Sequence, residues 1–400
     1  MTIEPLFEPF ALPCGVTLKN RIIKSAMSDA LGDGTGHPTQ EQLTLYRRWA
    51  EGGAAATIIG EVQSGPDFAE NPGNLVLNED ADLAAFHKLA QAGQSNGCKL
   101  WLQLGHAAAL AFKETSLPKG PSALNLPELQ CAAFSKNEIA VLPMRFARTA
   151  SHAQRAGFGG VQIHAAHGFV FSQFLSPLFN KRSDEYGGSI ANRTRALLAT
   201  IDAVREAVGP SFPIAVKLNS SDLLEGGLIQ EDALKVVTLL NDTSVDLIDI
   251  SGGTYFPGAK AASDGSGGGP YFLEFAGHAR ARTDKPLMVT GGFKSKDQAK
   301  EVIEANITDF IGMARAFIIA PEFATHWQSS NDFKLSFPKF KNPPVGGVTA
   351  WFTTQIRALG EGQTDQGLDR RLKTALAAYD VQTKRLTKIW LRHFASQQRI

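Results

Sequence analysis

The chain has 400 residues, of which 43% are hydrophobic and 20% are charged, and its formal net charge is +1. This composition supplies a large core and excludes intrinsic disorder. The near-neutral charge, without blocks of like charge, argues against a nucleic-acid or acidic-membrane partner. Three cysteines without CxxC spacing suggest neither a disulfide framework nor a cysteine-based zinc site. With no leader pattern and no apolar run that could span a bilayer, we expect a soluble, cytoplasmic protein.

Short apolar runs alternate with segments of helical periodicity along most of the chain. Each run is followed by Gly, Ser, Asn or His. Ser135 with Glu138 forms a capping box, and Ser295 precedes an acidic first turn, so both mark helix starts. The apolar runs are 21–27, 56–61, 99–104, 160–164, 214–218, 247–251, 287–290 and 309–313. The helical segments are 40–50, 81–94, 136–156, 190–208, 231–240, 272–282 and 296–304.

This alternation predicts parallel strands joined by right-handed crossovers, which is the α/β class. Eight regular units favour closure into a (β/α)8 TIM barrel over the alternative, an open doubly wound sheet. Residues 1–329 form the predicted barrel, with a hairpin at 6–19 capping its bottom. An excursion at 107–134 follows the third strand, as a lid or a substrate-shaping loop. Residues 330–400 form a linker around 343–347 and a helical extension at 367–394, a packing or oligomer element.

In such barrels the active site lies at the carboxyl ends of the strands, and phosphate binds after strands seven and eight. These ends combine an amide, a lysine and two histidines with glycine-rich turns. They offer no carboxylate pair for glycosidase chemistry, and the chain has no GxSxG or HExxH motif. The strand ends are 25–28, 61–63, 103–106, 164–167, 217–219, 251–253, 291–293 and 312–315.

Two histidines three residues apart, His164 and His167, end the fourth strand. Residues at i and i+3 of a strand point to opposite faces, so the imidazoles converge only if the strand has already turned. Converging neutral imidazoles can hold a carbonyl or phenolate oxygen. An isolated HxxH is equally compatible with structural histidines or half of a metal site.

Further motifs surround the histidine pair. They are Asn20-Arg21-Ile22 with Met27, the segment 46–53, Gln103-Leu104-Gly105-His106, HAAHG with FLSP and DEYGGS, and Gly291-Gly292-Phe293. Together they resemble the motifs of the old yellow enzyme family of FMN-dependent oxidoreductases. They appear in family order through most of residues 5–325, and 164–192 is the most specific part. The extension beyond the barrel is not covered.

The resemblance implies FMN in the barrel mouth and NAD(P)H as hydride donor. Gln103 would hydrogen-bond the pyrimidine edge of the flavin. Lys217, where the family usually has arginine, would lie near flavin N1 and O2 and raise the flavin potential. The first strand end, Ser25, Ala26, Met27 and Ser28, would line the ring together with Val62. Gly291, Gly292, Ala314 and Arg315 would hold the phosphate.

Three departures from the family pattern bear on the chemistry. The family's proton donor is a tyrosine directly after HAAHG, and this chain has Phe169, so Tyr255 or water would have to donate. Ala314 replaces a usual glycine, which costs about 1 kcal/mol if the position requires positive φ. Ala30 stands where some relatives place a substrate-binding tyrosine.

These residues predict an FMN-dependent NAD(P)H oxidoreductase of ene-reductase type. His164 and His167 would hold the carbonyl oxygen of an electron-poor alkene and stabilise the enolate. Phe169 keeps a rival open, in which the same flavin serves demethylation, desaturation or quinone or oxygen reduction. A flavin-free barrel that binds a phosphorylated metabolite is the remote alternative. The glycine string at 265–269 is expected to be a loop. The expected partner is a small molecule with a carbonyl or phenolic oxygen, and a homo-oligomer is possible.

Overall fold

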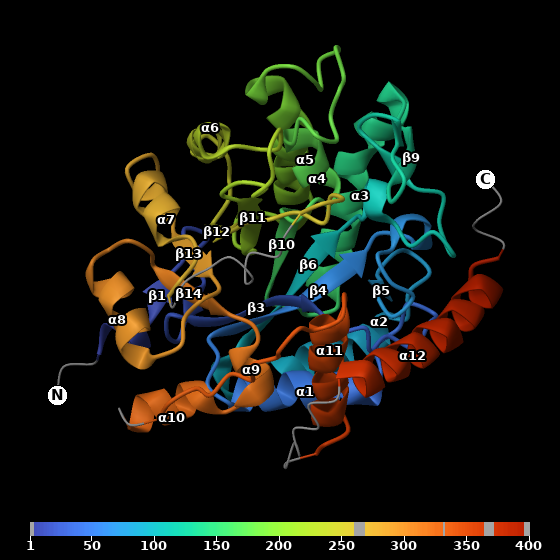
Figure 1. The fold of residues 1–400 in the computed structure, drawn as a ribbon. Helices are drawn as coiled ribbons and strands as arrows, with labels where there is room; N and C mark the ends of the chain where they lie inside the picture. Colours follow the sequence, from blue (N-terminus) through green and yellow to red (C-terminus); the bar gives the residue numbers. More distant parts are fainter. Residues whose placement is uncertain (1–3, 260–268, 331–332, 364–371, 396–400) are drawn as a thin grey trace.

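The computed structural model describes residues 4–259, 269–330, 333–363 and 372–395. Eight parallel strands form a closed barrel surrounded by helices (Figure 1). Closure comes from the pairing of β14 with β3, with Ile311 opposite Ile22. The predicted (β/α)8 barrel is therefore confirmed, and the open sheet is excluded. The strands are β3 (Ile22–Ser28), β4 (Ala56–Gln63), β6 (Lys99–Gly105), β10 (Gly160–Ala165), β11 (Ile214–Asn219), β12 (Leu247–Ser251), β13 (Leu287–Thr290) and β14 (Phe310–Met313).

Between the strands lie helices whose starts follow the capping signals in the sequence. Ser135 and Glu138 form the expected reciprocal capping box, and the Ser295 side chain accepts from the Gln298 backbone N–H. The barrel helices are α1 (Gln40–Glu51), α2 (Leu83–Gly93), α3 (Lys136–Arg155), α4 (Val170–Leu175), α5 (Ile190–Val208), α6 (Gln230–Leu240), α7 (Leu273–Arg280), α8 (Lys296–Glu304), α9 (Ala316–Ile319) and α10 (Phe323–Ser329).

The amino-terminal hairpin closes the bottom of the barrel. Its strands β1 (Phe10–Ala11) and β2 (Thr17–Leu18) are antiparallel, and Leu12 and Leu18 are buried against apolar side chains from the first halves of the strands. This packing removes the hairpin's apolar side chains from water. The cluster includes Ile23, Ile58, Trp101, Ala215, Leu247, Met288 and Phe310. The lower interior is therefore a dry, packed layer, and the polar chemistry is left to the upper end.

The excursion after β6 carries a small sheet of its own, which the sequence did not predict. It consists of β7 (Lys119–Gly120), β8 (Leu124–Asn125) and β9 (Gln130–Ala133). Lys119 Nζ lies 2.5 Å from Glu138 Oε1, which ties the sheet to the start of α3. The Arg182 guanidinium donates to the carbonyl oxygens of Pro121 and Phe134, each at 2.8 Å. The excursion is thus an ordered element fixed to the barrel.

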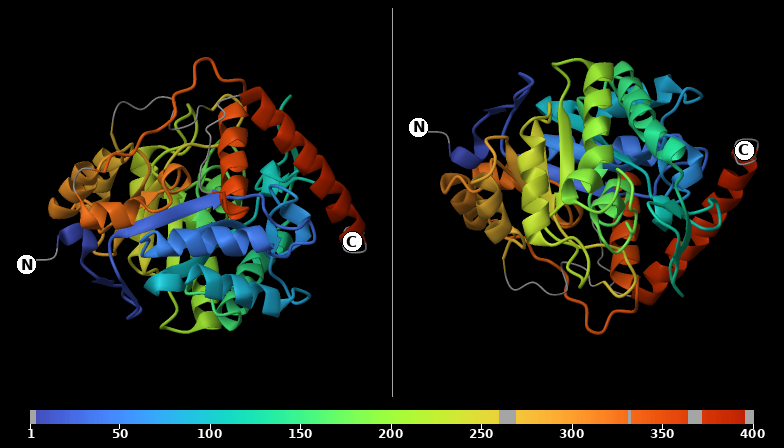
Figure 2. Two further views of the ribbon diagram at one scale, coloured as in Figure 1. Left: turned by 90° about the horizontal axis from the view of Figure 1, so that it is seen from below. Right: turned by 90° about the horizontal axis from the view of Figure 1, so that it is seen from above.

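The carboxyl-terminal extension contains two helices, α11 (Gly347–Gly360) and α12 (Leu372–His393). The sequence predicted α12 within 367–394 but placed a linker where α11 begins. The two helices pack together, with α11 against α1, on one side of the barrel (Figure 2). Trp390 and Phe394 join Ala69 and Val76 in a buried cluster. The extension therefore packs on the loop that follows β4. That residues 330–400 form a unit separate from residues 1–329 stays a prediction.

Some expected boundaries of helices and strands differ by one or two residues, as is usual at the ends of such elements. A 3-10 turn that contains Gly97 follows α2. The predicted glycine-rich loop at 265–269 lies outside the described residues except for Gly269. Among the described residues, we find no helix long and apolar enough to cross a membrane.

Candidate active site

Six strands contribute polar side chains that hydrogen-bond one another across the barrel interior. Gln103 Nε2 donates to Gln162 Oε1 at 2.8 Å, and Gln162 Nε2 donates to Asp249 Oδ2 at 3.0 Å. Lys217 Nζ lies 2.5 Å from the same Asp249 oxygen. Thr290 Oγ1 donates to Asp249 Oδ1 at 2.6 Å and lies 2.9 Å from Ser25 Oγ. The predicted residues Ser25, Gln103 and Lys217 thus belong to one network, and the unpredicted Asp249 is its centre.

The two histidines converge because the chain turns directly after β10. His167 adopts φ +61°, a left-handed conformation that is rare for a side-chain-bearing residue, and Gly168 follows with φ +86°. The His167 backbone N–H donates to Asn219 Oδ1 at 3.1 Å and holds this turn. The ring centroids of His164 and His167 are 5.2 Å apart. The geometry that the sequence required for convergence is therefore present.

Both imidazoles are neutral at physiological pH. Burial lowers the pKa of His167 to about 3, with a smaller contribution from the Lys217 ammonium. Burial, with His167 and Lys217 nearby, lowers the pKa of His164 well below its ordinary value. A neutral imidazole carries one N–H donor, so each ring can donate one hydrogen bond to a ligand oxygen.

The Phe169 ring lies near both the His164 ring and the Tyr255 ring. The Phe169 ring is buried, 4.8 Å from the His164 ring and 6.1 Å from the Tyr255 ring. The Tyr255 backbone N–H donates to the His167 carbonyl at 3.2 Å, and the Tyr255 side chain is 67% exposed. Tyr255 is therefore attached to the site by its backbone, and burial raises the pKa of its phenol to about 12.

The turns after β13 and β14 form a glycine cradle. Gly291 and Gly292 have φ of +100° and +89°, and a Cβ on Gly292 would lie 2.5 Å from Gly269 O and Pro270 Cα. Ala314 is not in the left-handed region, so the cost considered for a residue other than glycine does not arise there. No described residue forms a hydrogen bond or ion pair with the Arg315 guanidinium, which stacks 5.6 Å from the Phe352 ring. Its donors are available to an anion.

The first two strand ends supply apolar atoms and backbone. Ala26, Met27 and Ser28 are partly exposed at the end of β3, and Val62 is fully buried in β4. Asn74 Nδ2 donates to Ser28 Oγ at 3.3 Å. Ala30 has φ +52°, and a Cβ on Gly73 would lie 2.7 Å from the Ala30 carbonyl oxygen. The loops after β3 and β4 therefore touch at the rim of the site, and position 30 contributes no ring.

Two glutamates lie together at this rim. Glu61 is 3% exposed, and its Oε1 lies 3.4 Å from His164 Nε2. Burial, reinforced by Glu70, raises the pKa of Glu61 well above its ordinary value, and burial raises that of Glu70 to about 7 despite a hydrogen bond from Ser28. Sequence reasoning named Glu61 as a strand end without a role and missed Glu70, which lies in an irregular loop.

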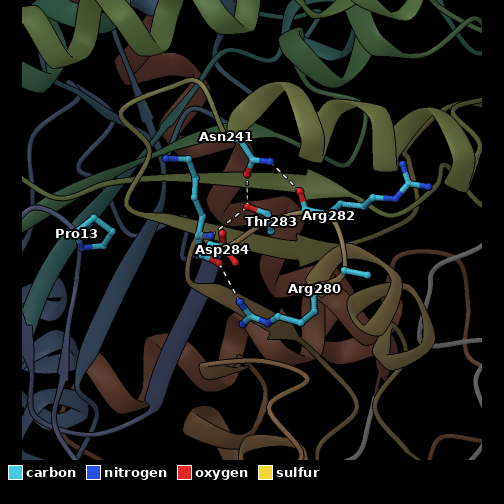
Figure 3. Close-up of a pocket in the computed structure, with 8 residues that line it drawn as sticks. Pro13, Asn241, Arg280, Arg282, Thr283 and Asp284 are labelled. Atoms are coloured by element: carbon cyan, nitrogen blue, oxygen red, sulfur yellow. Dashed lines mark hydrogen bonds between the residues drawn. The ribbon is translucent and has the colours of Figure 1, made fainter.

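A hollow of about 550 Å³ opens at the opposite end of the barrel, beside Pro13 and the loop before β13 (Figure 3). Two of the cations along it, Arg280 and Lys285, are bound internally. Arg280 pairs with Asp309, and Lys285 Nζ donates to the Thr243 carbonyl oxygen at 2.7 Å. Thr283 donates to Asn241. This hollow lies away from the histidines and is not part of the site.

Comparison with known proteins agrees with this geometry. A model of the NADH:flavin oxidoreductase / NADH oxidase family matches residues 5–332. The chain is 29% identical over 378 residues to the NADH-dependent flavin oxidoreductase iliE of Hypocrea jecorina (strain QM6a), covering 84% of this chain and 93% of that protein. It is 34% identical over 327 residues to the NADPH dehydrogenase of Bacillus licheniformis, covering 80% and 93%. The old yellow enzyme homologue from Zymomonas mobilis has the same fold, with a TM-score of 0.72 at 24% identity over 82% of this chain and 94% of that one.

The chain therefore belongs to the NADH:flavin oxidoreductase / NADH oxidase family, of old yellow enzyme type. It is an FMN-dependent oxidoreductase that uses NAD(P)H. Membership sets aside the flavin-free alternative. The residues present fit FMN, because two successive glycines with positive φ form the turn after β13 and the Arg315 guanidinium is free to bind phosphate.

Gln162, Asp249 and Glu70 are the site residues that sequence reasoning missed, whereas Ser251 was named as a strand end without a role. Ser251 Oγ lies 2.8 Å from His167 Nε2 and orients that ring. Gln162 and Asp249 are polar residues inside otherwise apolar strands, with Ile163 and Ile250 as their neighbours. Polar residues in buried strands need partners, and that signal was readable in the sequence.

Proposed function

We propose that this enzyme reduces an electron-poor alkene conjugated to a carbonyl group, with His164 and His167 holding the carbonyl oxygen. The observation that carries the proposal is the convergence of two neutral imidazoles 5.2 Å apart at the carboxyl end of β10. Two N–H donors aimed at one oxygen bind it more tightly as it gains negative charge, which lowers the barrier to hydride addition.

Bound FMN, reduced by NAD(P)H, would supply the hydride. Gln103 and Lys217 would hold the flavin's pyrimidine edge, and Ser25, Ala26, Met27, Ser28 and Val62 would line its ring. Gly291, Gly292, Ala314 and Arg315 would bind its phosphate. Lys217 and Gln103 are connected through the side chains of Gln162 and Asp249, so this network is held in place before the cofactor binds.

The fate of the proton is the point at which this chain departs from its family. Phe169 has no proton to donate, although its ring occupies the place beside His164. Tyr255, whose ring follows Phe169, is the candidate donor from the chain, with water as the alternative. The same substitution favours a second candidate function, in which the flavin serves a demethylase, desaturase or quinone reductase and no carbon is protonated.

The test is ligand binding to the oxidised enzyme. Because a phenol mimics the enolate oxygen, p-hydroxybenzaldehyde should produce a long-wavelength charge-transfer band. In His164→Ala and in His167→Ala the phenol should bind more weakly by roughly 1–3 kcal/mol, so the band should appear only at higher ligand concentration. FMN content, measured by absorbance after denaturation, is the control. Unchanged phenol affinity in both FMN-loaded variants would count against the assignment.

A further inference from the structure

The carboxyl group of Glu61 is buried beside the histidine that would bind the ligand oxygen. Gln63 Nε2 donates to Glu61 Oε2 at 3.1 Å, whereas Oε1 has no hydrogen-bond partner among the described residues. A Cβ on Gly105 would lie 2.6 Å from Glu61 Oε2, so the absence of a side chain at 105 makes room for this carboxyl group. Glu61 is thus held in place with one oxygen uncommitted.

The hydrogen bonds of His164 determine which of its ring nitrogens carries the proton that faces Glu61 Oε1. The backbone N–H of Ala166 donates to His164 Nδ1 at 3.3 Å, so Nδ1 is the acceptor nitrogen of this neutral ring. The proton is therefore on Nε2, which lies 3.4 Å from Glu61 Oε1. A ligand oxygen that accepts from His164 must approach Nε2, and it then lies next to Glu61 as well.

The groups around Glu61 favour its neutral form. No described cation forms an ion pair with it, and His164 and His167 are neutral. The hydrogen bond from Gln63 lowers the pKa of Glu61, but by less than burial or Glu70 raises it. Glu70 adds its own negative charge when ionised, and the Tyr255 phenol, whose pKa burial raises to about 12, stays neutral. Together with burial, the Glu70 charge keeps the pKa of Glu61 raised, which favours its O–H form.

We propose that Glu61 carries a proton and is the third donor to the ligand oxygen, beside His164 and His167, and that it delivers this proton to the oxygen. This inference rests on the proposed function. Once a hydride from NAD(P)H has reached the β-carbon by way of the flavin, the C=C electron pair shifts and negative charge collects on oxygen. The Glu61 O–H bond breaks, the ligand O–H bond forms, and the product leaves as an enol.

Water then protonates the α-carbon of the released enol, and Glu61 regains its proton from solvent. The sum consumes one NAD(P)H, one proton and one enone, and yields NAD(P)⁺ and the saturated ketone. Protonation at oxygen explains how the reaction can proceed with Phe169 in place of a carbon-protonating tyrosine.

Binding of cyclohexanone tests the donor role without any turnover. This ketone accepts hydrogen bonds but neither ionises nor undergoes reduction. Its affinity for the oxidised enzyme, followed by the flavin spectrum, should fall as pH rises and Glu61 ionises. Glu61→Gln keeps an N–H donor and should bind with little pH dependence. Glu70→Gln removes a negative neighbour, which lowers the pKa of Glu61, so affinity should be lost at a lower pH than in the wild type.

The outcomes separate the two proposals. If cyclohexanone affinity is unaffected by His164→Ala, the proposed function itself is wrong. If the histidine variants weaken binding while wild type and Glu61→Gln share one pH profile, only the role of Glu61 is overturned. If Glu61→Gln fails to fold, the Glu70→Gln variant decides. The role of Glu61 is overturned if folded, FMN-loaded Glu70→Gln shows the same pH profile of cyclohexanone affinity as the wild type.

Product stereochemistry tests the proton transfer. Reduction of 2-methyl-2-cyclohexenone should give racemic 2-methylcyclohexanone, because the α-carbon is protonated in solution. Glu61→Gln should slow flavin re-oxidation by this enone about 10²-fold or more, as expected for loss of a general acid, while reduction by NAD(P)H stays unchanged. A single enantiomer from the wild type, or an undiminished rate in Glu61→Gln, would overturn the step.

Discussion

The Lys217 ammonium lies 2.5 Å from the Asp249 carboxylate inside the barrel, and neither side chain reaches solvent. The cation expected to raise the flavin potential is therefore already paired. The Asp249 charge offsets part of the effect of Lys217 on the potential of a bound flavin. That effect is therefore smaller than the effect of an unpaired arginine or lysine.

Asp249→Asn should leave the Lys217 charge uncompensated. The expected loss is about 3–5 kcal/mol in the free energy of unfolding, measured by urea denaturation of the FMN-free protein. In FMN-loaded protein that folds, the flavin midpoint potential should rise. The double variant Lys217→Met with Asp249→Asn should regain most of the stability, since no buried charge remains. Equal stabilities of wild type and Asp249→Asn would contradict the finding that this pair is dry.

Gly292→Ala should abolish FMN retention, because its Cβ would meet backbone atoms at 2.5 Å and its φ is +89°. Gly291→Ala is the matched control. Its φ is +100°, but the nearest contact there is the Tyr271 ring at 3.2 Å. Both variants carry a strain of about 1–2 kcal/mol from the left-handed backbone. Flavin released on denaturation should be nearly absent from the first and present in the second; equal retention would show that the cradle does not contact the phosphate.

Phe169→Tyr should place a phenol beside the His164 ring, where the family has its proton donor. Reduction of 2-cyclohexenone should accelerate by about 10²–10⁴-fold, the range that a positioned general acid supplies, and a gain of about tenfold would already support the donor role. Stopped-flow measurement of flavin reduction by NAD(P)H serves as the internal reference and should be unchanged. If the wild type is slow and the tyrosine brings no gain, the quinone-reducing, demethylating or desaturating reading is favoured.

Lys24 should make stability depend on pH. It is fully buried, donates to the Ile58 carbonyl at 3.1 Å and lies 4.3 Å from the Trp49 ring; burial lowers its pKa to about 7. The unfolded chain keeps this proton to about pH 10.4. Between these values the native state binds fewer protons, so stability rises with pH. Below about pH 7 the full free-energy cost of burying the charged Lys24 side chain applies.

The measurement is the free energy of unfolding of wild type minus that of Lys24→Met, by urea denaturation from pH 7 to pH 10. This difference should grow by up to about 1.4 kcal/mol per pH unit. The subtraction cancels the other titrating groups, including Glu61, whose raised pKa acts in the opposite direction. A difference that is flat over this range would mean that Lys24 titrates normally.

The barrel and the histidine pair were readable in the sequence for a physical reason. Buried parallel strands require apolar runs such as Ile214–Asn219, and the glycine at 168 marks the turn that follows His167. Contacts between distant strands were not readable. The Lys217–Asp249 pair depends on the register of β11 against β12, and Glu70 lies in a loop without periodicity. The α11 helix follows a Pro-Gly stretch typical of linkers, which hid its start.

The Tyr379 hydroxyl of α12 accepts from Asn71 Nδ2 at 3.0 Å, and Trp390 of the same helix is buried against the loop that carries Glu70. The helix therefore braces the loop from outside the barrel. Removing the last helix from an expression clone would loosen a rim that touches the first strand end. A protein purified without this helix would keep the barrel topology, but the loop beside the site would be less firmly held. Truncated forms are therefore poor substitutes for the whole chain in screening substrates.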